Sequence, residues 1–488
     1  VTNAGKVLYI VAKSNNVVLG GSIATTNAAN NNLALSLTNS AGKTLTLTAS
    51  NAYQGGTTVW SGNLSVSNSA ALGSGAVTFL TNATLTALAS VNLTNSISVA
   101  TNMTVAVTTP QNAGLTNQIS GQVSGAGGLR INTAGATTYL ANANNSFGGG
   151  VHVQQGEFVV ASVGNAGGNS SLGTNGTVKL GNSATTGILQ WLGATAETTD
   201  KVFDLAGTTG GGIVSASGSG LFKITQNLST SGSGAKTLTL SGSGAGEFSG
   251  AIGNSAGGNT ALTQSGTGTW TLSGANTYTG ATTVSSGFLI VDGNQSAATG
   301  ALTVAGGATL GGSGTIGGAT TISGIHSPGT SPGVQTFTSG LTYSTSSTFL
   351  WELTGNTNSG RGTAFDGVNV SGGTLTINAG VINNLVFNGS GSTVNWSDAF
   401  WASNQQWLVF DNASLPTVSS NVFDTINVGL DSISQELTSV RSGSSFSWDT
   451  INDDVYLTYA IPEPSTYALF SLAGAALAGR ILVRRRRC

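Results

Sequence analysis

The sequence predicts an all-β fold in which short strands stack on one another as the coils of a solenoid. Three observations lead to this fold class. A frame of seven positions occurs three times with the same internal spacing. Short apolar runs of strand length alternate with clusters of Asn, Gly, Ser and Thr. No apolar pattern with a helical period extends beyond two turns in residues 1–460.

The clearest copy of the frame lies in residues 270–291, which read WTLSGANTYTGATTVSSGFLIV. The three copies comprise Asn51, Tyr53, Gly55, Thr57, Val59, Gly62 and Leu64; Asn145, Phe147, Gly149, Val151, Val153, Gly156 and Phe158; and Asn276, Tyr278, Gly280, Thr282, Val284, Gly287 and Leu289. Asn and Gly accept left-handed backbone angles, and alternating Thr and Val suit a half-buried strand, so each copy predicts a β-turn-β corner. A unit that cannot bury its apolar face alone must stack on its neighbours.

Further strands are expected along the chain wherever short apolar runs lie between Gly or Asn residues. The runs lie at 7–11, 17–19, 33–37, 45–47, 77–80, 158–160, 188–192 and 238–240. In residues 300–323, Leu310, Ile316 and Ile322 are six positions apart, which predicts one inward residue on each short face of a coil. The segment HSPGTSPG at 326–333 predicts turns, and strands should follow at 349–353 and within 366–377.

The composition changes at about residue 393. Four of the eight Trp lie between this point and residue 448, together with a cluster of acids. The acids are Asp398, Asp411, Asp424, Asp431, Glu436, Asp449, Asp453 and Asp454. Because the open end of a solenoid must be capped, we divide the chain into a repeat region (1–392), a C-terminal cap (393–460) and a tail (461–488). We expect Trp396, Trp401, Trp407 and Trp448 to close the core and the acids to face water.

The tail reads IPEPSTYALFSLAGAALAGRILVRRRRC. Its apolar segment of 17 residues, 467–483, would extend about 25 Å as a helix, within the lower range for a bilayer span. Arg480 lies near the end of this segment, where its side chain can reach the interface. Arg484, Arg485, Arg486 and Arg487 should stay on the cytoplasmic side and retain the chain at the membrane. The tail therefore predicts one short C-terminal transmembrane helix, with residues 1–460 on the far side.

Two family resemblances follow from these segments. The unit SGTGTWTLSGANTYTGATTVSSGFLIV resembles the autotransporter-associated β-strand repeat, which implies a right-handed parallel β-helix on a bacterial surface. The order of Pro462-Glu463-Pro464, short apolar segment and Arg cluster resembles the PEP-CTERM sorting signal. That resemblance implies export in a bacterium with a Gram-negative-type envelope and cleavage near Pro462, Glu463 and Pro464 by an exosortase. It also implies association with exopolysaccharide or biofilm matrix.

Composition and charge exclude several classes of protein. Hydrophobic residues make up 39% of the chain and the formal net charge is −2, which is too apolar and too weakly charged for a disordered protein. Residues 1–460 carry 10 basic and 16 acidic residues, without the basic face that a nucleic-acid partner needs. The single cysteine, Cys488, allows no disulfide within the chain. The calcium-binding nonapeptide repeat is absent, and we expect neither a metal nor a cofactor.

Candidate catalytic residues are few. His152 and His326 are the two histidines, and neither lies in a recognisable Ser-His-Asp motif. Asp200 and Asp204, with Lys201, form the one tight charged group in the repeat region, but solvated loop charges explain it better than catalysis. Asp453-Asp454 is expected to be a solvated turn.

Glycan binding stays open, since Trp60 or Trp191 could stack on sugars, although a packed aromatic is the favoured interpretation. We therefore expect a non-enzymatic structural or adhesin-like protein of the cell surface or extracellular matrix. Its expected partners are an exosortase-type processing enzyme, exopolysaccharide or other surface proteins, and the membrane before processing. The alternative is a polysaccharide-active enzyme, a lyase or glycosidase, on the same β-helix. Clustered acids and basic residues in a groove would favour that alternative.

Overall fold

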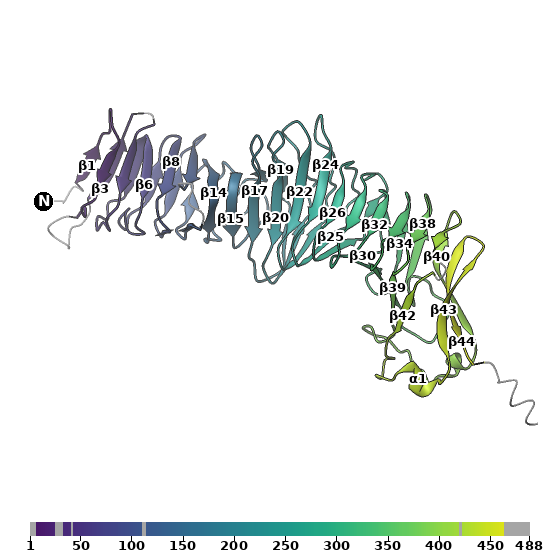
Figure 1. The fold of residues 1–488 in the computed structure, drawn as a ribbon. Coiled ribbons are helices and arrows are strands. Elements are labelled where there is room, and N and C mark those ends of the chain that lie inside the picture. The colour runs from purple at the N-terminus through teal and green to yellow at the C-terminus, as the bar shows by residue number, and fades with distance from the viewer. Residues whose placement is uncertain (1–5, 25–32, 41, 110–113, 419–421, 463–488) are drawn as a thin grey trace, which may run out of the picture. The chain divides into compact units, whose positions relative to one another are not determined.

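The computed structural model describes residues 6–24, 33–40, 42–109, 114–418 and 422–462. These residues are almost entirely strand and turn, as predicted (Figure 1). The helices among them are the 3-10 helix η2 (Ala399–Ala402) and the one-turn α-helix α1 (Leu437–Val440). The chain divides into two compact units, Val1–Gly324 and a second unit that begins at Ile325. The predicted boundary at 392/393 stays a prediction.

In the first unit, strands from successive coils lie side by side in parallel sheets. One sheet contains β1 (Val7–Ile10), β3 (Ala34–Thr38), β5 (Thr57–Ser61), β7 (Val77–Phe79), β10 (Ile97–Val99) and β13 (Val123–Ser124). A second contains β2 (Val17–Leu19), β4 (Thr44–Leu47), β6 (Asn63–Val66), β8 (Ala83–Ala87), β9 (Asn92–Leu93), β11 (Thr104–Thr108), β12 (Thr116–Ile119), β14 (Gly128–Leu140), β15 (Val151–Val160), β16 (Thr177–Leu180), β17 (Gly187–Trp191), β19 (Val202–Leu205), β20 (Gly212–Ala216), β22 (Lys236–Ser241), β24 (Thr260–Gln264), β26 (Thr282–Val284), β29 (Leu302–Val304) and β32 (Thr320–Ile322). Two more contain β18 (Glu197–Thr199), β21 (Leu221–Ile224), β23 (Ala245–Phe248), β25 (Thr269–Leu272), β27 (Phe288–Val291) and β30 (Thr309–Gly312), and β28 (Asn294–Gln295) with β31 (Thr315–Ile316).

The register of these strands defines the coils. Leu262 pairs with Thr282, and Thr282 pairs with Leu302, so the chain returns to the same position after equal intervals. This interval is near the lower end of the coil lengths typical of solenoid repeats. The long strands β14 and β15 each turn a corner within one strand. β14 pairs with β11 along residues 128–132 and with β12 along residues 137–140. Parallel pairing of successive coils confirms the parallel β-helix.

Each copy of the repeated frame forms a corner between two strand segments, and its glycines explain the turn. The second glycine has a left-handed backbone in all three copies, with φ of +87° at Gly62, +83° at Gly156 and +63° at Gly287. The first glycine permits a close approach between coils. A Cβ atom at Gly280 would lie 2.3 Å from the carbonyl oxygen of Thr260 on the preceding coil. The predicted β-turn-β corner is therefore confirmed.

The frame asparagine hydrogen-bonds to the coils on both sides. Each accepts from a backbone N–H of the preceding coil and donates through Nδ2 to an oxygen of the following coil. The partners are Ile23 and Ala71 for Asn51, Val123 and Ser171 for Asn145, and Ile252 and Gln295 for Asn276, at 2.5–3.1 Å. All three asparagines are buried. Because a buried amide without partners costs free energy, this position selects a side chain that both donates and accepts.

The frame aromatic explains a paired difference between the copies. The Tyr53 hydroxyl lies 2.7 Å from Thr57 Oγ1, and the Tyr278 hydroxyl lies 2.7 Å from Thr282 Oγ1. In the remaining copy, Phe147 replaces the tyrosine and Val151 replaces the threonine. All of these aromatic rings are buried. A buried hydroxyl needs a partner, so the sequence either keeps both hydroxyls or removes both.

The regular section at 300–323 confirms the coil geometry expected from its spacing. Leu310, Ile316 and Ile322 lie on β30, β31 and β32, which belong to three different sheets. All three side chains are buried. One inward-facing residue therefore lies on each face of the coil, as the spacing predicted.

The second unit also consists mainly of parallel strands, but its coils are longer. One set of strands contains β33 (Ile325–Pro328), β36 (Thr348–Glu352), β39 (Ile382–Val386) and β42 (Thr425–Val428); another contains β35 (Leu341–Tyr343), β38 (Leu375–Ile377) and β41 (Thr417–Val418); a third contains β34 (Val334–Phe337), β37 (Gly367–Val370), β40 (Gln405–Asn412), β44 (Asp454–Ala460) and β43 (Ser445–Ile451). Val334 pairs with Gly367, and Val368 pairs with Phe410, so the interval between paired positions is greater than in the first unit. A longer coil has more interior to fill.

Aromatic side chains fill this interior. Trp351, Trp396, Trp401 and Trp407 are fully buried, and the Trp396 and Trp401 rings meet edge to face with centroids 4.6 Å apart. An antiparallel hairpin of β43 and β44 ends the unit, since β44 pairs with both β43 and β40. This arrangement fits the expected closure of the core by tryptophans. Trp448 is half-buried.

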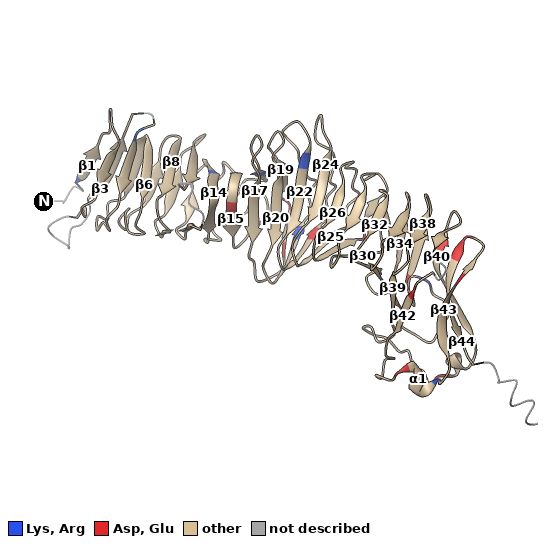
Figure 2. Cartoon of the chain, in the orientation of Figure 1, with Lys and Arg blue, Asp and Glu red and all other residues tan. Residues whose placement is uncertain are grey.

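The acids of residues 393–460 are mostly at the surface, where Figure 2 shows them gathered around β40, β44 and α1. Asp431 is an exception to the expectation that these acids face water, because its side chain is fully buried. Its carboxylate accepts hydrogen bonds from the backbone N–H groups of Trp396, Ile433 and Gln435. The acid there stabilises a loop, which composition alone did not indicate.

The predicted membrane helix lies outside the described residues, as do Glu463, Pro464 and Arg484–Arg487. Within the described ranges, no helix has the length and apolar character that crossing a membrane requires.

Candidate functional site

A groove of about 760 Å³ crosses the coils of the first unit over β8, β11, β14, β15 and β16. Polar and basic side chains line it, among them Asn63, Asn82, Arg130, His152 and Lys179. Neither aspartate nor glutamate is among its lining residues.

The parallel register of the sheet places three of these side chains in one row. Arg130 on β14 pairs with His152 on β15, and His152 pairs with Lys179 on β16. Their neighbours along each strand, such as Ile131 and Val153, are buried, so pleating directs the three basic side chains outward. Adjacent members of the row are separated by one strand spacing, about 4.8 Å. Sequence reasoning missed Arg130 and Lys179 because they are far apart along the chain.

Asparagines at the strand starts form the polar side of the groove. Asn63 Oδ1 accepts from the backbone N–H of Thr84 at 3.1 Å, and Asn82 Oδ1 accepts from that of Thr104 at 2.7 Å. Each amide thus holds the next coil through its oxygen. In the part of the chain that the structure describes, the Nδ2 groups of Asn63 and Asn82 have no protein partner, so both can donate to a ligand.

His152 is held by the backbone. Its Nε2 lies 2.8 Å from the carbonyl oxygen of Gly181, which can only accept, so Nε2 donates. No serine or aspartate of a catalytic triad completes this arrangement among the described residues. His152 is therefore a member of the groove and not the base of such a triad.

His326 is a core residue. It is fully buried, with Nε2 2.8 Å from Gln335 Oε1 and Nδ1 2.5 Å from the Tyr343 hydroxyl. Because the amide oxygen only accepts, Nε2 carries the proton and Nδ1 accepts from the tyrosine. Burial lowers the pKa of His326 to about 4, against a smaller opposing effect of the Gln335 hydrogen bond. Its role is structural.

The charged group at 200–204 does not form a catalytic pair. The exposed Asp200 accepts from the backbone N–H of Ala166, and the buried Asp204 accepts from Ser231 through both of its oxygens. Lys201 is fully buried, and its Nζ donates to the carbonyl oxygens of Gly173 at 3.1 Å and Asn175 at 2.5 Å. Burial lowers the pKa of Lys201, while the charge of Asp200 opposes that shift. The three side chains each hold loops together.

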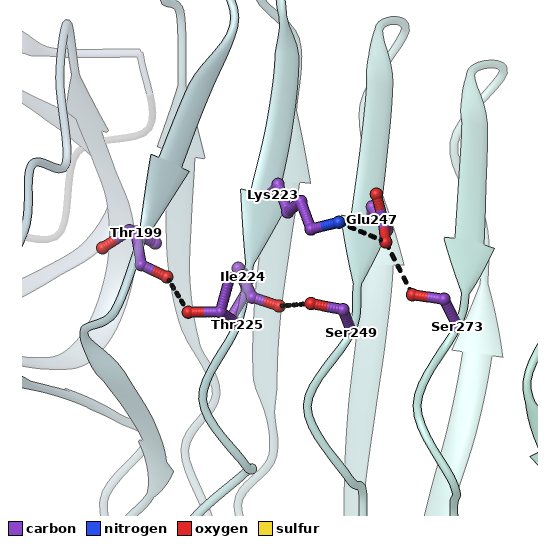
Figure 3. Close-up of polar contacts among 7 residues, drawn as sticks. All are labelled: Thr199, Lys223, Ile224, Thr225, Glu247, Ser249 and Ser273. Carbon is purple, nitrogen blue, oxygen red and sulfur yellow. Dashed lines mark hydrogen bonds and ion pairs between the residues drawn. The ribbon is translucent and has the colours of Figure 1, made fainter.

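An ion pair links two coils on the outer face of the sheet that contains β18, β21, β23 and β25 (Figure 3). Lys223 Nζ lies 2.8 Å from Glu247 Oε1, which also accepts from Ser273 Oγ at 2.6 Å. Burial opposes ionisation of Glu247, but the hydrogen bonds from Lys223 and Ser273 and the Lys223 charge together lower its pKa. These contacts tie three successive coils together and leave the Glu247 carboxylate occupied.

Hydroxyl groups extend this cross-coil bonding below the ion pair. Thr225 Oγ1 donates to the Thr199 carbonyl oxygen at 3.0 Å, and Ser249 Oγ donates to that of Ile224 at 3.1 Å (Figure 3). These hydroxyl groups therefore form hydrogen bonds within the fold.

The two tryptophans considered for sugar stacking differ. Trp60 is 56% exposed on β5. Trp191 is fully buried, donates through Nε1 to Glu197 Oε2 at 2.5 Å and stacks on Phe222 with ring centroids 5.1 Å apart. Trp191 is thus a core residue and cannot stack on a sugar.

The predicted turn at Asp453 and Asp454 is present in part. Asn452, with a positive φ of 56°, and Asp453 form the turn between β43 and β44, whereas Asp454 is the first residue of β44. Asp454 accepts from the backbone N–H of Asn412 at 3.0 Å. After the hairpin, Pro462 is the last described residue and is exposed. It follows shortly after β44 ends at Ala460.

Comparison with known protein families adds to this geometry. The passenger-associated-transport-repeat model matches residues 42–66, 135–160 and 262–291, and each match contains one copy of the frame. The PEP-CTERM protein-sorting motif matches residues 460–487. No curated protein matches the chain. The chain thus carries three passenger-associated transport repeats and a PEP-CTERM sorting motif, which marks it as an exported surface protein and a substrate of an exosortase-type enzyme.

Proposed function

We propose that this chain is a non-enzymatic structural or adhesin-like protein of the cell surface or extracellular matrix that associates with exopolysaccharide. One observation carries the proposal: the sorting motif at 460–487 begins where the closing hairpin of the β-helix ends, at Ala460. The sorting segment thus follows directly on the hairpin that ends the second unit. Stacked parallel coils rich in Ser, Thr and Asn present hydroxyl and amide groups on their surface, which suits contact with sugars or with other proteins of the same kind.

The arrangement of carboxylates supports a role without catalysis. Glycoside hydrolysis uses two carboxyl groups, roughly 5 to 10 Å apart, on either side of the scissile bond. The groove over β8–β16 has no acid among its lining residues. Asp204 and Glu247, both in the first unit, already accept hydrogen bonds within the fold.

A polysaccharide lyase is the second candidate, and the basic row of the groove is the observation that favours it. A lyase base removes the proton on the carbon beside a uronate carboxylate; the electron pair forms a C=C bond and the glycosidic oxygen leaves. Because Nε2 of His152 donates to Gly181, Nδ1 is the ring nitrogen that would take such a proton. This candidate makes a distinct prediction, since each cleavage creates an unsaturated sugar end that absorbs ultraviolet light.

Localisation and turnover together test the proposal. The full chain is expressed in a bacterium with a Gram-negative-type envelope that has an exosortase, and in a matched strain without it. We expect surface or matrix-associated protein in the first strain only, with a C-terminus trimmed close to Pro462. The purified surface form should release no products from acidic or neutral polysaccharides. Retention in the cytoplasm of both strains would contradict the surface role, and product release that His152→Gln abolishes would establish the lyase.

A further inference from the structure

Charge is distributed unevenly along the chain. Residues 1–156 contain four basic residues, Lys6, Lys13, Lys43 and Arg130, and no Asp or Glu at all. Residues 1–460 as a whole nevertheless carry 10 basic and 16 acidic residues. Figure 2 shows the same contrast, with few charged residues on the strands before β15 and acids concentrated around β40 and β44. Most of the residues that line the groove over β8–β16 therefore come from the part of the chain that contains no acid, which favours an anionic ligand there.

The cations of the groove differ from three lysines that lie further along the first unit. Lys201 and Lys236 are buried and donate to backbone carbonyls, and Lys223 pairs with Glu247. Arg130 and Lys179 are exposed, and within the described residues neither has an ion-pair partner or a hydrogen bond.

Acids close to the row are already engaged. Glu157, further along β15, accepts from Thr137 Oγ1 at 2.7 Å. Asp204 pairs with Lys179 in strand register, but it is buried and bonded to Ser231. Arg130 and Lys179 therefore keep their charges available to an external anion.

We propose that this groove binds a linear acidic polysaccharide, with uronate carboxylates on Arg130 and Lys179 and sugar hydroxyls on the amides of Asn63 and Asn82. The guanidinium of Arg130 can bind a carboxylate through two parallel hydrogen bonds, and Lys179 supplies a second positive charge two strands away. His152 lies between them in the row. A chain molecule running across the coils would contact all three in order. This assignment rests on the proposed exopolysaccharide association and names its chemistry and its site.

The groove suits a polysaccharide better than a nucleic acid. Single-stranded nucleic acids bind on aromatic platforms along a strongly basic track. No aromatic side chain other than His152 lines the groove, and its permanent positive charges are two. A mixture of amide and hydroxyl groups with two cations matches a polymer that carries many hydroxyls and regularly spaced carboxylates.

Binding of three probes by isothermal titration calorimetry tests the assignment. The probes are polygalacturonate, fully methyl-esterified polygalacturonate of the same length, and single-stranded DNA of matched charge. We expect the full chain to bind polygalacturonate, with affinity that falls as salt rises, and to bind the neutral ester and the DNA at least tenfold more weakly. Arg130→Gln with Lys179→Gln should weaken polygalacturonate binding about tenfold, because two exposed ion pairs are lost.

The matched control is Lys6→Gln with Lys13→Gln, which removes two exposed cations outside the groove. Its affinity should change less than twofold, and circular dichroism should be the same for both double variants. Equal losses in the two variants, or DNA binding as tight as polygalacturonate binding, would overturn the assignment. Tight binding of the neutral ester would also overturn it while leaving the broader exopolysaccharide role intact. That role fails separately, if the exported protein does not localise to the surface or matrix.

Discussion

The paired hydroxyls of the frame provide a quantitative test of how this β-helix is held together. Tyr278 and Thr282 are 3% and 4% exposed, and their hydroxyl oxygens lie 2.7 Å apart. Tyr278→Phe removes one hydroxyl and leaves Thr282 Oγ1 buried without this partner. An unsatisfied buried hydroxyl costs about 1 to 3 kcal/mol, so the variant should lose that much local stability. Thr282→Val should lose a similar amount of stability, because it leaves the tyrosine hydroxyl without this hydrogen-bond partner.

The double variant should recover most of the loss. Replacing both partners of a buried hydrogen bond by apolar groups of the same shape changes stability little. The copy with Phe147 and Val151 already has this apolar combination. We therefore expect a coupling energy of about 1 to 2 kcal/mol between the two substitutions. As a reverse control, Phe147→Tyr alone should destabilise its own corner, and Val151→Thr should rescue it.

Amide hydrogen exchange followed by mass spectrometry is the appropriate assay, because stability in a solenoid is local and each coil can be followed separately. Peptides within residues 262–291 report on the Tyr278 corner, and peptides within 135–160 serve as an internal reference. Additive losses in the double variant would refute the reasoning, since they would mean that the two hydroxyls do not depend on each other.

The remaining predictions concern the second unit and the tail. Burial lowers the pKa of His326 to about 4 and raises that of Asp366 to about 8. The contribution of His326 to the unfolding free energy is therefore full above about pH 6.5 and is lost as the pH falls toward 4. The contribution of Asp366 is full below about pH 4 and is lost as the pH rises toward 8. Each contribution changes by about 1.4 kcal/mol per pH unit. Between pH 4 and 6.5 these two pH dependences of the unfolding free energy cancel in the unmodified chain. Urea unfolding followed by tryptophan fluorescence should therefore show stability that rises with pH in Asp366→Asn and falls with pH in His326→Gln. Parallel slopes in the two variants would contradict this. A chain that ends at Ala460 should fold like the full chain but be lost from the cell surface in a strain with an exosortase. Replacing Arg484–Arg487 with Ser should reduce surface retention while leaving the circular dichroism spectrum unchanged, and normal retention would count against the role of these arginines.

The repeated frame made most of the first unit predictable from sequence. Each of its positions has a local physical requirement: left-handed backbone at Gly287, an amide that bridges coils at Asn276, an inward apolar side chain at Val284. Local requirements leave a pattern in the sequence, and the β-turn-β corner follows from it. The spacing of Leu310, Ile316 and Ile322 was predictable for the same reason.

Residues whose environment comes from distant coils were not predictable. Trp191 is buried because Phe222, on another coil, stacks on it. The buried environment of Asp431 depends on Trp396, which lies much earlier in the chain. The row of Arg130, His152 and Lys179 depends on the register between β14, β15 and β16, and coils of unequal length hide that register in the sequence. The candidate site could therefore be located only once the strands were paired.

Size-exclusion chromatography with light scattering, applied to polygalacturonate after prolonged incubation with the full chain, tests the central account most directly. One elution profile reports both binding and the length of the polymer. We predict that the protein elutes with the polysaccharide and that the molar mass of the polymer is the same as in the incubation without protein. Polymer that becomes shorter over time would contradict the account and establish an enzyme, and protein that elutes apart from an intact polymer would contradict binding.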